Sequence, residues 1–92
     1  MLRFDWDPDK AASNEQKHGV SFPEAATAFG DPLSITVPDP DRSQGEARFV
    51  LVGLTYLGRL VVVAHAEVED SIRIISARSA TGAERKIYEE EE

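Results

Sequence analysis

The chain has 92 residues, no cysteine and a formal net charge of −7. This length is typical of one domain with a modest core, and the lack of cysteine excludes disulfide frameworks and thiolate sites. No apolar run approaches the roughly 20 residues that cross a bilayer, and the first residues lack the apolar stretch of a signal peptide. We therefore expect a single cytoplasmic domain over residues 1–92, away from membranes, with an acidic tail at residues 89–92.

The first third of the chain predicts a short strand and two helices. Residues 2–5 alternate apolar and polar side chains, which indicates a strand. Asp7 is a favoured N-cap in front of a first-turn proline, so a helix is expected over residues 8–17. Ser21 stands three residues before a glutamate, which is the spacing of a capping box, and predicts a second helix that ends at Phe29.

Four further strands are predicted over residues 33–37, 46–53, 59–67 and 71–78. Their short links imply an antiparallel meander. Thr81 and Glu84 repeat the capping-box spacing and predict a C-terminal helix directly after the last strand. The expected fold class is α+β, with a mostly antiparallel sheet of four to six strands, two N-terminal helices and one C-terminal helix. We expect the helices to cover one face of the sheet and to leave the other for function.

The sequence offers few groups for chemistry. It contains no P-loop, no GxGxxG stretch and no nucleophile elbow, and its two histidines stand 47 residues apart, so we expect neither a metal nor another cofactor. Strand alternation places Arg59, His65 and Glu67 on one face of the sheet. Arg73 and Arg78 are an odd number of residues apart, so they face opposite ways unless a bulge re-aims one of them.

A set of arginines, a histidine and a glutamate suits the cleavage of RNA by attack of its 2′-OH on the neighbouring phosphorus. His65 could act as base or acid, since a histidine titrates near neutrality, and Glu67 could orient it. Arg48, Arg73 and Arg78 could hold the phosphate through paired N–H groups. The alternative is structural, because a histidine at the end of an apolar strand is more often half-buried and already satisfied. Arg48 could likewise form only an exposed pair with a nearby glutamate.

Five stretches of the chain resemble the BrnT toxin family. They are Phe4-Asp5-Trp6-Asp7-Pro8, the run from Asn14 to Ala25, Gly45-Glu46-Ala47-Arg48-Phe49, Gly58-Arg59-Leu60-Val61-Val62-Val63, and Arg73-Ile74-Ile75-Ser76-Ala77-Arg78-Ser79-Ala80-Thr81. The similarity covers nearly the whole chain in the family's order. It implies a RelE-like fold and a bacterial toxin of a type II toxin–antitoxin pair. Such a toxin would be a metal-independent endoribonuclease that cuts RNA and inhibits translation.

The same resemblance implies partners and site residues. The partner would be a BrnA-type antitoxin with a DNA-binding domain, so that the chain meets DNA only through the complex. The expected catalytic residues are His65, Glu67, Arg73 and Arg78, and the expected RNA-binding residues are Lys17, His18, Arg48 and Arg59. The family usually has further basic residues where this chain has Gly82 and Ala83. The alternative function is a non-catalytic toxin relic, an interaction module that binds the antitoxin and tunes transcription.

Overall fold

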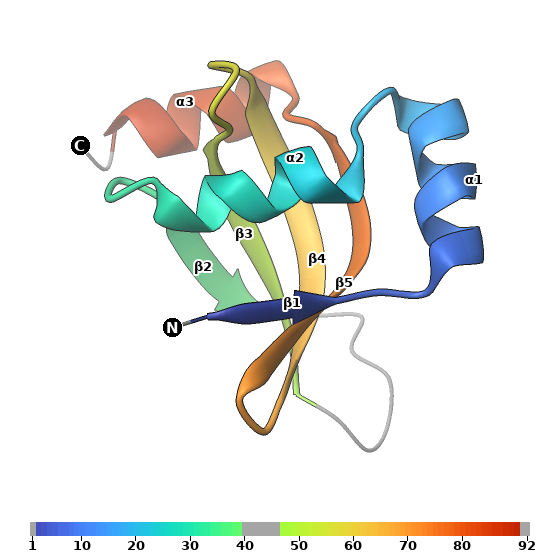
Figure 1. The fold of residues 1–92 in the computed structure, drawn as a ribbon. Coiled ribbons are helices and arrows are strands. Elements are labelled where there is room, and N and C mark those ends of the chain that lie inside the picture. Colours follow the sequence, from blue (N-terminus) through green and yellow to red (C-terminus); the bar gives the residue numbers. More distant parts are fainter. Residues whose placement is uncertain (1, 40–46, 91–92) are drawn as a thin grey trace.

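A five-stranded sheet forms the centre of the fold (Figure 1). The structure is a computed structural model that describes residues 2–39 and 47–90. In chain order the elements are β1 (Arg3–Asp5), α1 (Pro8–His18), α2 (Phe22–Thr27), the 3-10 turn η1 (Ala28–Gly30), β2 (Ile35–Pro38), β3 (Arg48–Leu54), β4 (Leu60–Val68), β5 (Ser71–Ser79) and α3 (Gly82–Glu90). Glu46, expected at the start of the third strand, lies outside the described residues. Within the described ranges, no helix has the length and apolar character that crossing a membrane requires.

The strands follow the order β1-β5-β4-β3-β2 across the sheet. Each neighbouring pair from β2 to β5 is antiparallel, whereas β1 runs parallel to β5 at the far edge. β1 can take this edge because α1 and α2 carry the chain across the sheet before β2 begins. The predicted meander and the predicted α+β class are therefore confirmed.

Local capping explains where the helices begin. The Asp7 carboxylate accepts a 2.8 Å hydrogen bond from an N–H in the first turn of α1. At α3 both halves of the predicted capping box form: the Glu84 N–H donates to the Thr81 hydroxyl at 3.2 Å, and the Glu84 carboxylate accepts from the Thr81 N–H at 2.9 Å. At α2 only one half forms, a 3.2 Å bond from the Glu24 N–H to the Ser21 hydroxyl. The Glu24 carboxylate bonds to side chains of the β3–β4 hairpin instead.

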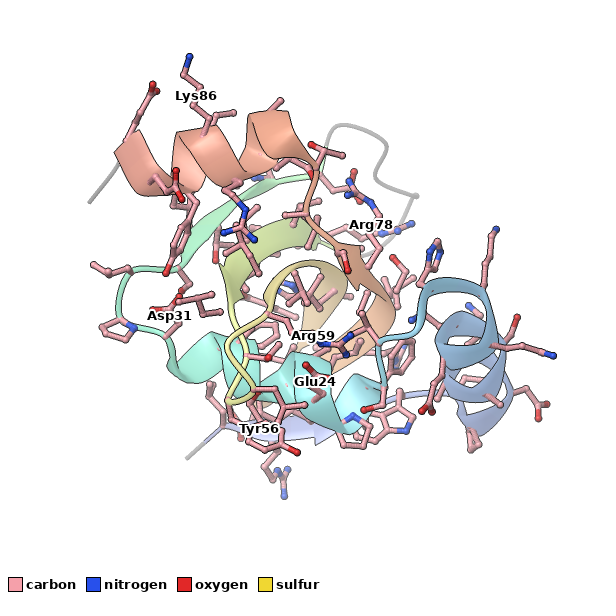
Figure 2. The ribbon with its side chains drawn as sticks, turned by 90° about the horizontal axis from the view of Figure 1, so that it is seen from above. Glu24, Asp31, Tyr56, Arg59, Arg78 and Lys86 are labelled. Atoms are coloured by element: carbon pink, nitrogen blue, oxygen red, sulfur yellow. The ribbon has the colours of Figure 1, made fainter. Side chains whose placement is uncertain are left out.

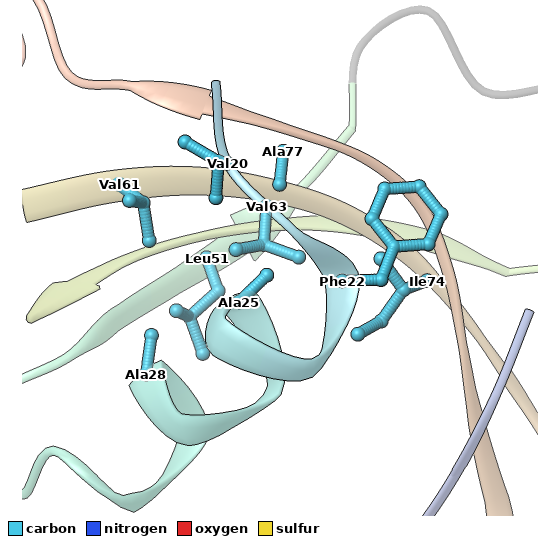
Figure 3. Close-up of a cluster of buried hydrophobic side chains, with 9 residues drawn as sticks. All are labelled: Val20, Phe22, Ala25, Ala28, Leu51, Val61, Val63, Ile74 and Ala77. Carbon is cyan, nitrogen blue, oxygen red and sulfur yellow. The ribbon is translucent and has the colours of Figure 1, made fainter. Parts of the chain in front are cut away.

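The two faces of the sheet carry different residues. The core face carries Leu51, Val61, Val63, Ile74 and Ala77, which pack with Val20, Phe22, Ala25 and Ala28 (Figure 3). The opposite side, the open face, carries Arg48, Val62, Ala64, Ala66, Arg73 and Arg78. α2 covers the core face, so an apolar layer separates the helix from the open face.

α3 lies on the side of the sheet opposite α2 (Figures 1 and 2). Tyr88 of α3 is 4% exposed, and its hydroxyl donates to Oδ2 of Asp31 at 2.6 Å. The same oxygen accepts from the N–H of Leu54 at 2.9 Å, at the end of β3. The expectation that all helices would cover one face is therefore wrong, because Tyr88 holds α3 over one end of the other face.

A buried asparagine fixes α1 beside β5. The Asn14 side chain donates to the carbonyl of Ala77 at 2.8 Å and accepts from the N–H of Ala77 at 3.1 Å. It also donates to the carbonyl of Val20 at 3.1 Å. The amide thus provides hydrogen-bond partners for the backbone of β5 at a point where the short strand β1 no longer pairs with it.

Candidate functional site: the arginines of the open face

A bulge in β5 decides which way its two arginines face. The register between β4 and β5 shifts between Ala64 and His65, which leaves Ile75 as an extra residue on β5. Side chains alternate along a strand, so Arg73 and Arg78 would face opposite ways without this extra residue. With it they lie on the same face. The odd spacing in the sequence allowed this arrangement only if such a bulge occurred between them.

Three arginines consequently share the open face. Arg73 pairs with Ala66 of β4, and Ala66 pairs on its other side with Arg48 of β3. Neighbouring strands lie about 4.8 Å apart, so the Cα atoms of these two arginines stand roughly 10 Å apart across a small side chain. Arg78 pairs with Val62, further along β4. The face therefore has a row of two arginines over an alanine, with a third arginine at the end nearer α3.

Arg48 carries a donor that no described residue uses. Its side chain is 21% exposed, and its Nη2 lies 3.6 Å from Oδ2 of the buried Asp39. Its Nε is buried and has no hydrogen-bond partner among residues 2–39 and 47–90. A buried donor without a partner costs roughly 1–3 kcal/mol. A ligand oxygen that accepted from this nitrogen would recover that cost.

Arg73 stands beside a hollow at the junction of β1 and α1. Its Nε lies 3.6 Å from Oδ1 of Asp5, its register partner on β1. The hollow is lined by Asp5, Trp6, Asp7, Lys10 and Arg73. The side chain of Arg73 is 47% exposed, so solvent screens its attraction to Asp5. Two cations, two carboxylates and an aromatic ring therefore line this hollow at one end of the arginine row.

Arg78 is held at short distances by a carboxylate of α3. Its Nη1 and Nη2 each donate at 2.8 Å to a different oxygen of Glu84, and Nη1 also donates to the carbonyl of Ser79 at 3.2 Å. The bonds to Arg78 lower the pKa of Glu84 to about 2, and they raise the pKa of Arg78. Glu84 is therefore ionised at neutral pH and offsets part of the charge of the arginine.

His65 lies on the core face, away from these arginines. It is 1% exposed, and its ring packs against Phe29 and Phe49 with centroid separations of 4.8 and 5.8 Å. Burial lowers its pKa, so the folded protein favours the neutral ring. The expectation that His65 shares a face with Arg73 and Arg78 is wrong, because it belongs to the core-face set of β4 whereas both arginines pair with open-face residues.

Three other expected site residues also lie away from the open face. Glu67 is exposed near the end of β4, and it lines a second hollow with Leu2, Arg3, Glu69, Asp70, Ser71 and Ile72. Lys17 and His18 are exposed in the last turn of α1. Since α1 lies beside β5 (Figure 1), these two residues stand at the edge of the sheet.

Arg59, expected to bind RNA, forms an ion pair with the buried Glu24, and its own side chain stays 42% exposed. Its Nε donates to Oε2 of Glu24 at 2.8 Å, and its Nη2 bonds to Oε1 of Glu24 and to the carbonyl of Gly19. The Thr55 hydroxyl donates to the same carboxylate at 2.8 Å. The bond to Arg59 lowers the pKa of Glu24 and raises that of the arginine. Figure 2 shows this pair beside α2, apart from Arg78, so Arg59 secures α2 to the hairpin.

The sequence reasoning missed the carboxylates that accompany the arginines: Asp5, Asp39 and Glu84. Glu84 was foreseen only as a capping residue. Its position six residues after Arg78 could have signalled the pair, because the capping box fixes the turn between strand and helix. The other two pairs depend on strand register, for which the sequence carries no comparable signal.

Comparison with known proteins first gives the class of the chain. It matches the profile of a family described as "Ribonuclease toxin, BrnT, of type II toxin-antitoxin system" over residues 6–84. The chain is therefore a ribonuclease toxin of the type II toxin–antitoxin class by family, with an antitoxin as the expected kind of partner and RNA as the target. Within that class it belongs to the BrnT family.

A solved structure shares the fold. The structure is similar to the 1.1 Å crystal structure of the Brucella abortus ribonuclease toxin BrnT, with a TM-score of 0.64 and 21% sequence identity. The similarity covers 88% of this chain and 99% of that chain. No curated protein matches the sequence. The resemblance seen in the sequence motifs is thus confirmed at the level of family and fold.

Proposed function

We propose that the open face is the RNA-cleaving site of a metal-independent endoribonuclease. The observation that carries this proposal is the row in which Arg48 and Arg73 flank Ala66. Cations on either side of Ala66, which is itself fully buried, can hold a phosphate and stabilise the charge that develops as the 2′-OH attacks phosphorus and the 5′ oxygen leaves, with water carrying the two protons. The buried Nε–H of Arg48, which has no partner among residues 2–39 and 47–90, offers this phosphate a desolvated donor. Arg78 supplies a third cation further along the strand.

The other expected residues take different roles in this proposal. His65 packs the core, since it is buried on the face away from the arginines and neutral when folded. Glu67 stands outside the cleavage site because it shares the strand face of His65 and not that of the arginines. Lys17 and His18 are exposed at the sheet edge, so they suit contacts to the RNA backbone away from the cleaved phosphate. Arg59 acts through folding because its guanidinium already bonds to Glu24.

In the cell, we propose that residues 1–92 act as one toxin domain whose RNA cleavage inhibits translation. The partner we propose is a BrnA-type antitoxin with a DNA-binding domain, so that the toxin reaches DNA only through the complex. An antitoxin segment that covers the open face should be acidic or should supply helices that block access, because acidic side chains complement the positive charge of the three arginines there. Co-expression with such a partner should give a stable complex at micromolar concentration. Separate elution of the two proteins would contradict this part of the proposal.

A cleavage assay on synthetic RNA tests the proposed activity. Because the nucleophile belongs to the substrate, the products should carry a 2′,3′-cyclic phosphate or the 3′-phosphate formed when it opens. EDTA should leave the rate unchanged, and RNA with 2′-deoxy substitution at the cleaved position should resist. Addition of the protein to a cell-free translation reaction should reduce protein synthesis. Loss of cleavage in EDTA would overturn the metal-independent chemistry.

The second candidate is a non-catalytic relic that only binds the antitoxin and tunes transcription. It is favoured by the carboxylate next to each open-face arginine, at 3.6 Å for Arg48 and Arg73 and 2.8 Å for Arg78. The net charge of −7 also opposes the approach of RNA. This candidate predicts an intact antitoxin complex together with no RNA cleavage at any salt concentration, whereas the ribonuclease predicts cleavage that weakens as salt rises.

A further inference from the structure

The guanidinium of Arg78 is only partly used by the bonds described above. A guanidinium has five N–H donors in one plane. Nη1 donates one N–H to Glu84 and the other to the carbonyl of Ser79, and Nη2 donates one N–H to Glu84. Within the part of the chain that the structure describes, the donors without a partner are Nε–H and the second N–H of Nη2. These two point in parallel from one edge of the plane, in the spacing that matches two oxygens of one phosphate.

Glu84 is itself held in place on the other edge. Its Oε1 accepts from the backbone N–H of Thr81 at 2.9 Å as well as from Arg78 at 2.8 Å. Its backbone belongs to the first turn of α3, and Tyr88 one turn later is anchored to Asp31 at 2.6 Å. The carboxylate therefore has a fixed position relative to the sheet, and the arginine that it grips is restrained with it.

We propose that Glu84 is a positioning residue for RNA cleavage: it holds one edge of the Arg78 guanidinium so that the opposite edge binds a substrate phosphate. This inference rests on the proposed function of the open face. The proposed role differs from an inhibitory role for Glu84, in which the substrate phosphate would have to displace the carboxylate from Arg78. The two edges of the guanidinium are separate, so the carboxylate and the phosphate can bind at once (Figure 2 shows Arg78). An arginine that Glu84 already holds on one edge loses less freedom when the substrate binds the other edge.

A double-mutant cycle on cleavage tests whether Glu84 acts through Arg78. We expect Arg78→Ala to lower kcat/KM about 100-fold and Glu84→Ala about 10-fold, as for a misplaced catalytic cation. In the Arg78→Ala background, Glu84→Ala should change kcat/KM less than about two-fold, because no arginine remains to be positioned. Equal losses from Glu84→Ala in both backgrounds would show a merely structural role. An increase in kcat/KM would show inhibition, and either result overturns the proposal.

Thr81→Ala is the matched control for the helix cap. It removes the hydroxyl that accepts from the Glu84 N–H at 3.2 Å but leaves the carboxylate on Arg78. Its melting temperature should fall, while its kcat/KM should stay within about two-fold of the parent, since capping affects folding and not the arginine. A loss in Thr81→Ala as large as that in Glu84→Ala would assign the effect to the cap and overturn the proposal.

A second readout does not require cleavage. The side-chain N–H signals of Arg78 in a ¹H–¹⁵N spectrum, assigned with Arg78→Ala, can be followed while inorganic phosphate is added to the full chain. Phosphate should shift the Nε–H signal while the Nη groups stay restrained, because Glu84 remains bound. Release of the Nη groups by phosphate, or the absence of any Nε–H shift, would overturn the positioning role. If the NMR result holds and no RNA is cut, the proposed function fails while this binding geometry stands.

Discussion

Arg48 and Arg73 are both register partners of Ala66, one from each neighbouring strand. In the proposed cleavage site, this relationship lets two guanidinium groups bind one phosphate. Ala66 contributes only a methyl group between them, so no larger side chain separates the two cations. Each arginine also lies 3.6 Å from a carboxylate, Asp39 for Arg48 and Asp5 for Arg73.

The first prediction concerns Arg73. Arg73→Ala should lower the cleavage rate about 100-fold or more, because the phosphate loses a fixed donor in the transition state. Folding should survive, since the side chain is 47% exposed. The rate with saturating synthetic RNA measures the effect. Lys86→Ala is a control of equal charge change: Lys86 points away from the sheet in Figure 2, and this variant should keep the parent rate.

The second prediction concerns the buried donor of Arg48. Arg48→Lys keeps the positive charge but removes the Nε–H that has no partner among the described residues. The cleavage rate should fall about 10- to 100-fold if that donor binds the phosphate, whereas a purely electrostatic role would leave it nearly unchanged. Urea unfolding of the same variant checks that its stability is preserved. A parent-like rate in Arg48→Lys would remove the specific donor from the account.

The third prediction concerns His65. His65→Gln should retain cleavage within about two-fold, because the ring is buried on the opposite face, while its unfolding free energy should drop by roughly 1–3 kcal/mol through lost packing. Initial rates and urea denaturation on the same preparation separate the two effects. A folded His65→Gln variant without activity would contradict this prediction and would support proton transfer by His65.

His65 should also make stability depend on pH. Its pKa is lowered by burial in the folded state, so the unfolded chain binds a proton at higher pH than the native protein does. The stabilisation is therefore complete above the ordinary histidine value of about 6.5 and is lost as the pH falls below it. The parent should lose more unfolding free energy between pH 7.5 and 5 than His65→Gln does. Equal losses in the two proteins would contradict a depressed pKa.

The capping boxes and the strands were predictable from sequence because they depend on neighbours in the chain. Thr81 and Glu84 meet within one turn of helix, and both expected bonds form. The family motifs extended this prediction to the fold, which is confirmed, and to Arg73 and Arg78, whose role in cleavage stays a prediction. Local reasoning went wrong at Glu24, whose carboxylate meets the distant Arg59 and so cannot complete its own capping box.

The geometry of the site was beyond local reasoning because it is set by register. One extra residue at Ile75 turns Arg78 to the face of Arg73, and strand alternation alone cannot tell where such a residue will stand. The same rule put His65 correctly on the face of Glu67, but the sequence could not show that this face is the one covered by α2. Burial of His65 between two aromatic rings follows from that packing.

The fourth prediction concerns Asn14. Asn14→Ala leaves the N–H and the carbonyl of Ala77 without their side-chain partner, at a cost of roughly 1–3 kcal/mol for each buried group. The melting temperature should fall markedly, and Ser13→Ala, a change at the exposed neighbouring position, should leave it almost unchanged. Thermal unfolding followed by circular dichroism measures both variants. Equal melting temperatures would mean that α1 is held by other contacts.

The most direct test of the central claim is cleavage of one synthetic RNA in EDTA by the parent chain and by an Arg48→Ala, Arg73→Ala double variant. The account predicts that the parent produces 2′,3′-cyclic phosphate ends without a divalent metal. It predicts that the double variant, shown to be folded by circular dichroism, is slower by about 100-fold or more. A double variant that cuts as fast as the parent, or a parent that is inactive until a metal is added, would contradict it.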